Sequence, residues 1–247
     1  MKKITLAILL IYSTFSYSQE RCATDIYSDL LEEKYPEYAV QRQKVNSQTK
    51  KWIKNNPIIS NKTIITIPVV IHVVWNTNAE NISDAQIFSQ MDVLNDDFRR
   101  TNVDAINTPS VWQNIAADSE IDFCLATTDP NGVATTGITR TQTSQTSFSI
   151  NGSDMKSSSS GGIDPWDQDD YLNIWVCDLS GGILGYATPP SNFNNPQDGV
   201  VIGYKYFGTI GAVQSPYNKG RTATHEVGHW LNLDHIWGGG GNCGNDN

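Results

Sequence analysis

The chain has 247 residues, a formal net charge of −9, 38% hydrophobic residues and 17% charged residues. This length allows one domain of good size, or a short N-terminal segment followed by a larger domain. The sequence contains no basic patch of the kind that binds nucleic acid. A negative charge of this size indicates solubility, without indicating a particular substrate or oligomeric state.

The first 18 residues have the features of a secretory signal peptide. Lys2 and Lys3 precede the apolar run of residues 4–12, and the small residues Ser16 and Ser18 follow it. A membrane anchor is the alternative, but this run is well short of the ~20 apolar residues that span a bilayer. We therefore expect cleavage after Ser18, a secreted extracellular protein and no stable membrane insertion.

Residues 19–62 differ from the rest of the chain in their polar, weakly amphipathic character. Their pattern predicts helices over residues 29–35 and 38–45, followed by a linker. A segment of this kind between a signal peptide and a main domain is typical of a pro-segment. The sequence therefore divides into a signal peptide (1–18), a pro-segment (19–62) and a catalytic domain (63–247).

From Thr63 onward the pattern predicts a mixed α+β domain. Residues 64–75 are β-branched and almost continuously apolar, which favours a buried strand of a mixed or parallel sheet. His72 within this strand is interpreted as a core or rim histidine and not as a ligand. Ser83 to Gln86 form a capping box that opens a helix, whose apolar face runs through residue 98. Further strands are predicted at residues 121–126, 171–177, 184–188 and 198–204, and the third of these is an edge strand because two prolines end it.

Residues 127–162 are rich in Ser, Thr and Gly, and this composition predicts loops and not core. Asp164, Asp167, Asp169 and Asp170 follow in a cluster of hard oxygen ligands, so a calcium site is conceivable there. The favoured interpretation of the cluster is a solvated acidic loop that caps the next strand.

Three of the four histidines in the chain fall within residues 224–235. His225 and His229 are one turn apart on a helix, so both imidazoles leave the same face, and Glu226 projects beside them. This is the H-E-x-x-H pattern of a zinc protease, and His235 extends it with a third histidine. Three nitrogen ligands and one open position are typical of a catalytic zinc. The alternative is an amphipathic helix in which His and Glu are ordinary polar positions.

The extended form of this pattern has glycine where this chain has Asn232. Glycine lets the chain leave the helix with positive φ, and asparagine is the next best residue for that left-handed conformation. We therefore expect Asn232 to make the same turn, so that His235 folds back toward the metal. Asp234 receives no role.

The run from His225 through Gly238 resembles the pappalysin family of metzincin metallopeptidases, in particular its secreted bacterial members. The resemblance extends upstream to about Thr63 and covers most of the mature chain. It includes the segments 164–167, 171–176, 184–188 and 220–224. The resemblance implies a metzincin-type N-terminal subdomain, which is a mixed twisted sheet of about five strands with a backing helix and an active-site helix.

On this resemblance we expect a secreted zinc-dependent endopeptidase that hydrolyses peptide bonds. His225, His229 and His235 hold the zinc, and Glu226 is the general base for a zinc-activated water. The resemblance also implies that a protein or peptide substrate pairs with the edge strand as an added antiparallel strand. The candidates for that main-chain role are Gly185, Tyr186, Ala187 and Thr188.

Cys22 is a further candidate site residue, because a thiolate is a good zinc ligand that takes the position of the catalytic water. The family resemblance supports a zymogen in which a pro-segment cysteine blocks the zinc. The alternative is an N-terminal disulfide, for example with Cys243. Cys124 and Cys177 either pair with each other or stay as buried thiols.

The chain continues only twelve residues past His235 and has no methionine after the motif. A metzincin continues into a C-terminal subdomain with a methionine turn, so we expect that subdomain to be largely missing from this chain. The alternative functions are therefore a catalytically inactive zinc-binding fragment or a secreted binding module. Another zinc hydrolase, such as an amidase, is less compatible with the strand motifs upstream of the helix.

Overall fold

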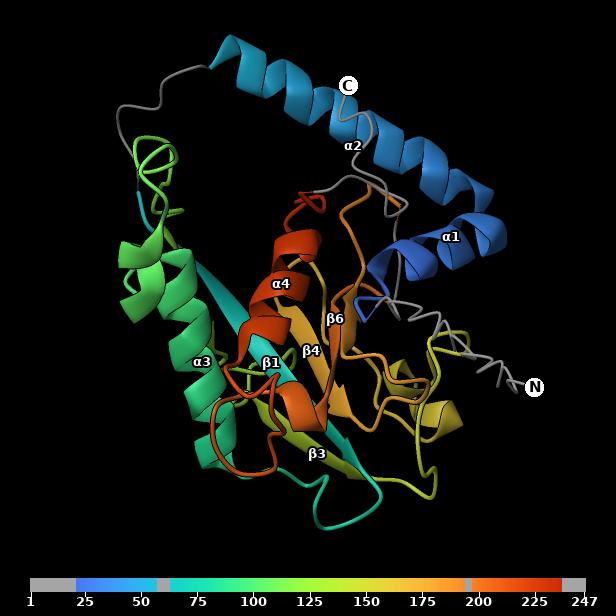
Figure 1. The fold of residues 1–247 in the computed structure, drawn as a ribbon. Helices are drawn as coiled ribbons and strands as arrows, with labels where there is room; N and C mark the ends of the chain where they lie inside the picture. Colours follow the sequence, from blue (N-terminus) through green and yellow to red (C-terminus); the bar gives the residue numbers. More distant parts are fainter. Residues whose placement is uncertain (1–20, 57–62, 194–196, 237–247) are drawn as a thin grey trace, which may run out of the picture.

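The computed structural model describes residues 21–56, 63–193 and 197–236, so the predicted signal peptide and Cys243 lie outside the described residues. The N-terminal segment, by which we mean residues 21–56, forms helices α1 (Thr24–Lys34) and α2 (Pro36–Asn55). Figure 1 shows α2 as a long helix at the rim of the molecule, with α1 next to it. Helix α1 begins before its predicted range and ends one residue short of it, whereas α2 extends beyond its predicted range at both ends.

One mixed sheet forms the centre of the domain. Its strands are β1 (Ile65–Trp75), β2 (Ile121–Leu125), β3 (Ile138–Gln142), β4 (Leu172–Cys177), β5 (Gly185–Ala187) and β6 (Val200–Gly203). The spatial order is β2-β1-β4-β6-β5, and β3 pairs with the second half of β1. Only β5 runs antiparallel to its neighbour, β6. The predicted mixed sheet is confirmed, with β4 in its centre and β5 at its edge.

Strand β3 corrects the prediction that residues 127–162 contain loops only. It pairs in parallel with residues 71–75 of β1, and its own residues are half-buried or exposed. Composition missed it because Thr139 and Thr141 were counted as loop residues, whereas β-branched threonine favours a half-buried strand. Phe148 and Met155 from the same stretch are also buried. The sheet therefore has six strands and not about five.

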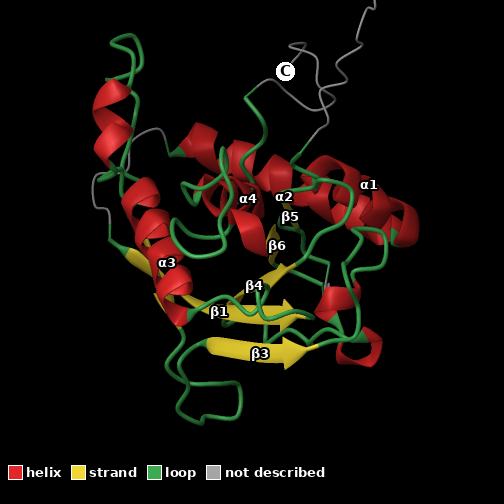
Figure 2. Cartoon of the chain, turned by 60° about the horizontal axis from the view of Figure 1, so that its bottom comes forward, coloured by secondary structure: helices red, strands yellow, loops and turns green. Residues whose placement is uncertain are grey.

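Helices α3 (Asp84–Phe98) and α4 (Arg221–Trp230) cover one face of the sheet, as Figures 1 and 2 show. Ser83 accepts a hydrogen bond from the Gln86 N–H, so the predicted capping residue opens α3. Strand residues alternate between the two faces. Val69, Ile71 and Val73 therefore join the core beneath α3 and α4.

A second core lies on the other face of the sheet, and the N-terminal segment is part of it. Trp175 of β4 and Tyr186 of β5 are fully buried there. Ala23, Tyr27 and Leu31 from α1 and its start complete the same cluster. Among the described residues, no helix combines the length and the apolar character that a bilayer crossing requires. Short 3-10 helices complete the connections: Val103–Asn107, Asp154–Lys156, Ser158–Ser160 and Tyr204–Tyr206.

Candidate metal centre

Helix α3 fixes the start of α4, the helix that carries the histidine motif. Gly220 precedes α4 in the left-handed conformation, with φ of 70°. The Gln90 side-chain amide donates a hydrogen bond of 2.9 Å to the Gly220 carbonyl. Asp97, on the last turn of α3, accepts a 2.7 Å hydrogen bond from the Thr224 hydroxyl and pairs with Arg221. These contacts fix the position of the first turn of α4 relative to α3.

The turn after α4 has the geometry expected from Asn232. Its φ is +72°, and its N–H donates to the His229 carbonyl. The Leu233 N–H donates to the Gly228 carbonyl at 2.9 Å. This pair of bonds is a Schellman motif, which reverses the chain direction at the helix end. The prediction for Asn232 is confirmed, and the reversal returns His235 to the helix.

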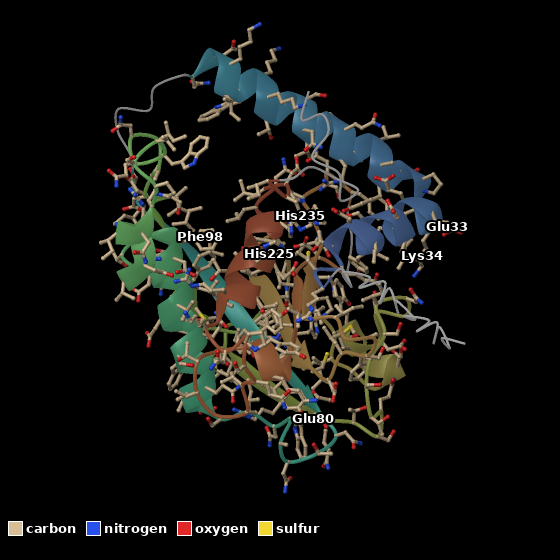
Figure 3. The ribbon with its side chains drawn as sticks, in the orientation of Figure 1. Glu33, Lys34, Glu80, Phe98, His225 and His235 are labelled. Atoms are coloured by element: carbon tan, nitrogen blue, oxygen red, sulfur yellow. The ribbon has the colours of Figure 1, made fainter. Side chains whose placement is uncertain are left out.

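The three histidines of the motif converge on one point. Their Nε2 atoms are 3.0 Å apart for His225 and His229, 3.1 Å for His229 and His235, and 3.2 Å for His225 and His235. A tetrahedral zinc with nitrogen ligands at 2.0–2.1 Å needs separations of about 3.3 Å between those nitrogens. The observed triangle fits such an ion. Figure 3 shows His225 and His235 close together beside α4.

Contacts at the Nδ1 atoms set the orientation of the His229 and His235 rings. The Nδ1 atom of His229 lies 2.7 Å from the Leu233 carbonyl oxygen, which assigns the proton to Nδ1 and leaves Nε2 free to ligate. The Nδ1 atom of His235 lies 3.3 Å from Asp25 of the N-terminal segment. Burial, and then the neighbouring His229 and His235, lower the pKa of His225 to about 4. Burial likewise lowers the pKa of His229, so His225 and His229 are suited to bind as neutral ligands.

The carboxylate of Glu226 is buried beside this triangle, with 1% of its surface exposed. It accepts a 2.8 Å hydrogen bond from the Thr24 hydroxyl and a 3.5 Å contact from the Cys22 thiol. Burial raises the pKa of Glu226 to about 7, and the bonds from Thr24 and Cys22 oppose that rise. A carboxyl group in this range is suited to accept and return a proton near neutral pH.

Cys22 joins the three histidines in a group whose potential ligand atoms all lie within 4.8 Å of one another. Burial and the nearby Glu226 raise the pKa of its thiol, so with no cation beside it the sulfur keeps its proton. A metal held by the three histidines would have this sulfur within reach as a fourth ligand. Thr24 and Asp25, which contact Glu226 and His235, were not predicted. Their only signal in the sequence is that they directly follow the candidate Cys22.

The N-terminal segment runs along the edge strand that the sequence predicts for substrate. Cys22 and Gly185 form a parallel bridge. The Ala23 N–H donates to the Gly185 carbonyl at 3.1 Å, and the Leu184 N–H donates to the Arg21 carbonyl at 2.9 Å. Of the other predicted main-chain groups, the Ala187 N–H contacts the N-terminal segment, because it donates to the Thr24 hydroxyl. The Thr188 N–H instead donates to the Gly199 carbonyl. Tyr186 is a buried member of β5, and its register partner in the sheet is Val201 of β6.

A cavity of about 330 Å³ lies next to this junction. Cys22, Leu184, His225 and Glu226 line one side of it. The loop before α4 forms the rest, with Pro216, Tyr217, Lys219, Arg221 and Thr222. The N-terminal segment, through Cys22, therefore forms part of the wall of a cavity that His225 and Glu226 also line.

Gly185 is the one position of β5 that tolerates no side chain. A Cβ there would lie 2.9 Å from the Val201 carbonyl oxygen and 3.1 Å from Cγ of Glu226. We expect Gly185→Ala to lower the free energy of unfolding by about 1–3 kcal/mol through overpacking and to displace Glu226. In Gly228→Ala, the matched control on α4, the new Cβ meets only Leu233 at 3.6 Å. Urea unfolding of both variants should therefore show a loss for the first and a gain of about 0.5–1 kcal/mol for the second.

The other candidates lie away from this centre. His72 is fully buried, 2.7 Å from the Thr139 hydroxyl and 3.0 Å from the Asn173 amide oxygen, as a core histidine should be. Cys124 and Cys177 are both free thiols, the first exposed and the second buried. Asp164 accepts bonds from Ser158 and belongs to a capped loop. The calcium site at Asp164, Asp167, Asp169 and Asp170 stays a prediction.

Comparisons with known proteins place this geometry among peptidases. The peptidase M43 family model, described as pregnancy-associated plasma protein-A, matches residues 156–247. An extracellular metalloprotease of Pyricularia oryzae is 29% identical over 195 residues, which are 76% of this chain and 56% of that protein. An extracellular metalloprotease of Verticillium alfalfae is 38% identical over 82 residues, 30% of this chain and 28% of that protein. The chain thus spans about half, or less, of the length of these curated relatives.

Two solved structures are similar over most of the fold. Mature mirolysin of Tannerella forsythia, in complex with a cleaved peptide, is 56% identical with a TM-score of 0.71, and the match covers 73% of this chain and 68% of that one. A mutant of Tannerella forsythia promirolysin is 48% identical with a TM-score of 0.76, covering 87% of this chain and 70% of that one. The predicted sheet-and-helix architecture is therefore confirmed by structures as well as by its own strand order.

Proposed function

Since this chain belongs to the pappalysin family of metzincin metallopeptidases, we propose that it is the precursor of an exported zinc endopeptidase. The observation that carries the proposal is the triangle of three Nε2 atoms with separations of 3.0–3.2 Å, beside a buried carboxylate. Export is supported by the signal-peptide pattern, and by the extracellular metalloproteases among the relatives.

In this proposal His225, His229 and His235 are the zinc ligands. Zinc held by these residues would supply Lewis acidity to the scissile carbonyl and would make the attacking water more acidic. Glu226 takes a proton from the attacking water at its carboxylate and delivers it to the leaving amine. The raised pKa of Glu226 supports this exchange, because a carboxyl group with a pKa near neutral pH both accepts and releases a proton at little cost. A peptide is the substrate, bound through the main-chain groups of Leu184, Gly185 and Ala187.

The N-terminal segment is the pro-segment of this precursor. Promirolysin matches 87% of this chain and mature mirolysin matches 73%, a difference of 14% of 247 residues, or about 35 residues. That is close to the length of residues 21–56. The segment also occupies the main-chain groups of β5 and donates hydrogen bonds to Glu226. Cys22 would hold the fourth metal position, while Thr24 holds the general base.

The test is peptide cleavage by the chain after proteolytic removal of the N-terminal segment, with and without a zinc chelator. We expect cleavage that chelation abolishes and zinc restores. One zinc bound per chain with no cleavage would instead support the alternative of an inactive zinc-binding fragment.

Replacing Cys22 tests the latency part of the proposal on the uncleaved chain. We expect Cys22→Ala to raise peptide cleavage by roughly tenfold or more, because it opens the fourth metal position while leaving the fold intact. Cys124→Ala is the matched control, since Cys124 is an exposed thiol on β2, and it should change nothing. Equal activity of both variants would remove Cys22 from the mechanism. A further rise in Cys22→Ala/Thr24→Val would assign part of the latency to Thr24.

A further inference from the structure

A pocket on the face of the sheet opposite α3 and α4 holds one side chain of the N-terminal segment. Tyr27 of α1 enters it and is 1% exposed. Its ring centroid lies 4.5 Å from that of Tyr186 on β5. Apart from Tyr27, the contacts that build the pocket come from residues 153–197, and therefore from the domain. The domain thus supplies the walls that surround this side chain, and these walls are separate from the three motif histidines.

The most unusual wall of the pocket is a buried lysine. The Nζ atom of Lys156 lies 4.9 Å from the Tyr27 ring, 5.1 Å from the Trp175 ring and 5.2 Å from the Tyr186 ring. It donates a 2.6 Å hydrogen bond to the Gln197 carbonyl. Burial lowers the pKa of Lys156 to about 7, although the Asp198 carboxylate opposes this. An ammonium group with only 3% exposure gains from each aromatic face that replaces its lost water.

The pocket also forms hydrogen bonds with the phenol hydroxyl of Tyr27. The Tyr27 hydroxyl donates to the Gln197 side-chain oxygen at 3.3 Å, and the Ser153 hydroxyl donates to Tyr27 at 3.3 Å. Phenylalanine would fill the same volume but would lose both hydrogen bonds, one of them from the buried Ser153 hydroxyl. The pocket is therefore specific for tyrosine among the aromatic residues.

Much of the segment beyond α1 adds little comparable contact. On α2, Val40, Trp52 and Ile53 are more than half exposed, and only Tyr38 is buried. Tyr27 and Tyr38 are the two fully buried aromatic side chains of the segment, and neither contacts the metal centre. Of the two, Tyr27 has its ring against Tyr186 and Lys156. We propose that this pocket is a binding site for a peptide tyrosine, and that it retains the N-terminal segment after the chain is cut. Only the consequence, continued inhibition after processing, rests on the proposed function.

The test uses the full chain with a site for a specific protease inserted within residues 57–62. After cleavage under chelation, so that no zinc bridges Cys22 to the histidines, gel filtration and release kinetics measure how tightly the segment stays bound. We expect co-elution for the unmodified chain. Tyr27→Phe should release the segment about two- to tenfold faster, and Tyr27→Ala about a hundredfold or more faster. Ile26→Ala, an exposed position on the same helix, should behave as the unmodified chain does.

A receptor-side variant separates recognition from loss of fold. Ser153→Ala should speed release by less than Tyr27→Phe, because it removes only one of the two hydrogen bonds that Tyr27→Phe removes. The double variant should release the segment no faster than Tyr27→Phe alone. Circular dichroism of the uncleaved variants reports folding independently. Immediate release of the unmodified segment, or equal release from Tyr27→Ala and Ile26→Ala, would overturn the proposal. Neither result would affect the assignment of the zinc ligands, which zinc-dependent cleavage tests separately.

Discussion

Glu226→Gln is expected to lower kcat for peptide cleavage by about 10²- to 10⁴-fold while leaving zinc binding unchanged. Glutamine keeps the size of the side chain and still accepts the hydrogen bond that Thr24 donates at 2.8 Å. It cannot take a proton from water and return it to the amine. Because Glu226 is buried beside the three nitrogens without being one of the ligand group, removal of its charge separates proton transfer from metal binding.

The measurement is cleavage of a peptide by the chain freed of its N-terminal segment, with zinc per chain determined on the same samples. Asp234→Asn is the matched control, since Asp234 is an exposed acidic residue only eight positions away. Cleavage by the Glu226→Gln protein at the rate of the unmodified chain would contradict the assignment of Glu226 as the general base. Loss of zinc in that variant would show instead that Glu226 supports the ligands.

The local part of the site was predictable because short-range geometry determines it. The helical repeat alone puts His225 and His229 on one face. The left-handed preference of asparagine accounts for Asn232, whose φ of +72° turns His235 back. The strand pattern likewise located β5, whose proline-rich end placed it at the sheet edge. In each case the determining interaction spans fewer than about a dozen residues.

The parts that the sequence did not reveal depend on contacts between distant segments. Thr24 and Glu226 are 202 positions apart, and no local pattern encodes their hydrogen bond. The same applies to Asp25 beside His235, and to Tyr27 above Lys156. Lys156 lies in a Ser- and Gly-rich stretch whose composition predicts exposure. It is nevertheless buried, because distant residues surround its ammonium group: Tyr27, Trp175, Tyr186, Thr188 and Gln197. Tertiary packing overrides composition at such positions.

The second large effect is expected at the metal ligands. His229→Gln should weaken zinc binding by about two to three orders of magnitude. Zinc bound by four protein ligands contributes about 10–16 kcal/mol, so each ligand accounts for about 2.5–4 kcal/mol. His229 is the best oriented of the three, because its Nδ1 is fixed by the Leu233 carbonyl at 2.7 Å. Competition with a chromogenic chelator measures the affinity on the uncleaved chain, independently of any activity.

His72→Gln is the internal control, because it removes the one histidine of the chain that lies outside the motif. His72 contacts Thr139 and Asn173 within the sheet, so its loss should lower the melting temperature without changing zinc affinity. The opposite pattern, with zinc affinity sensitive to His72 and insensitive to His229, would contradict the metal centre itself. If Cys22→Ala lowers the zinc affinity as His229→Gln does, the Cys22 thiol is a fourth ligand of the metal. The precursor then holds its metal more tightly than the processed enzyme, and the same residue that blocks catalysis also secures the zinc before activation.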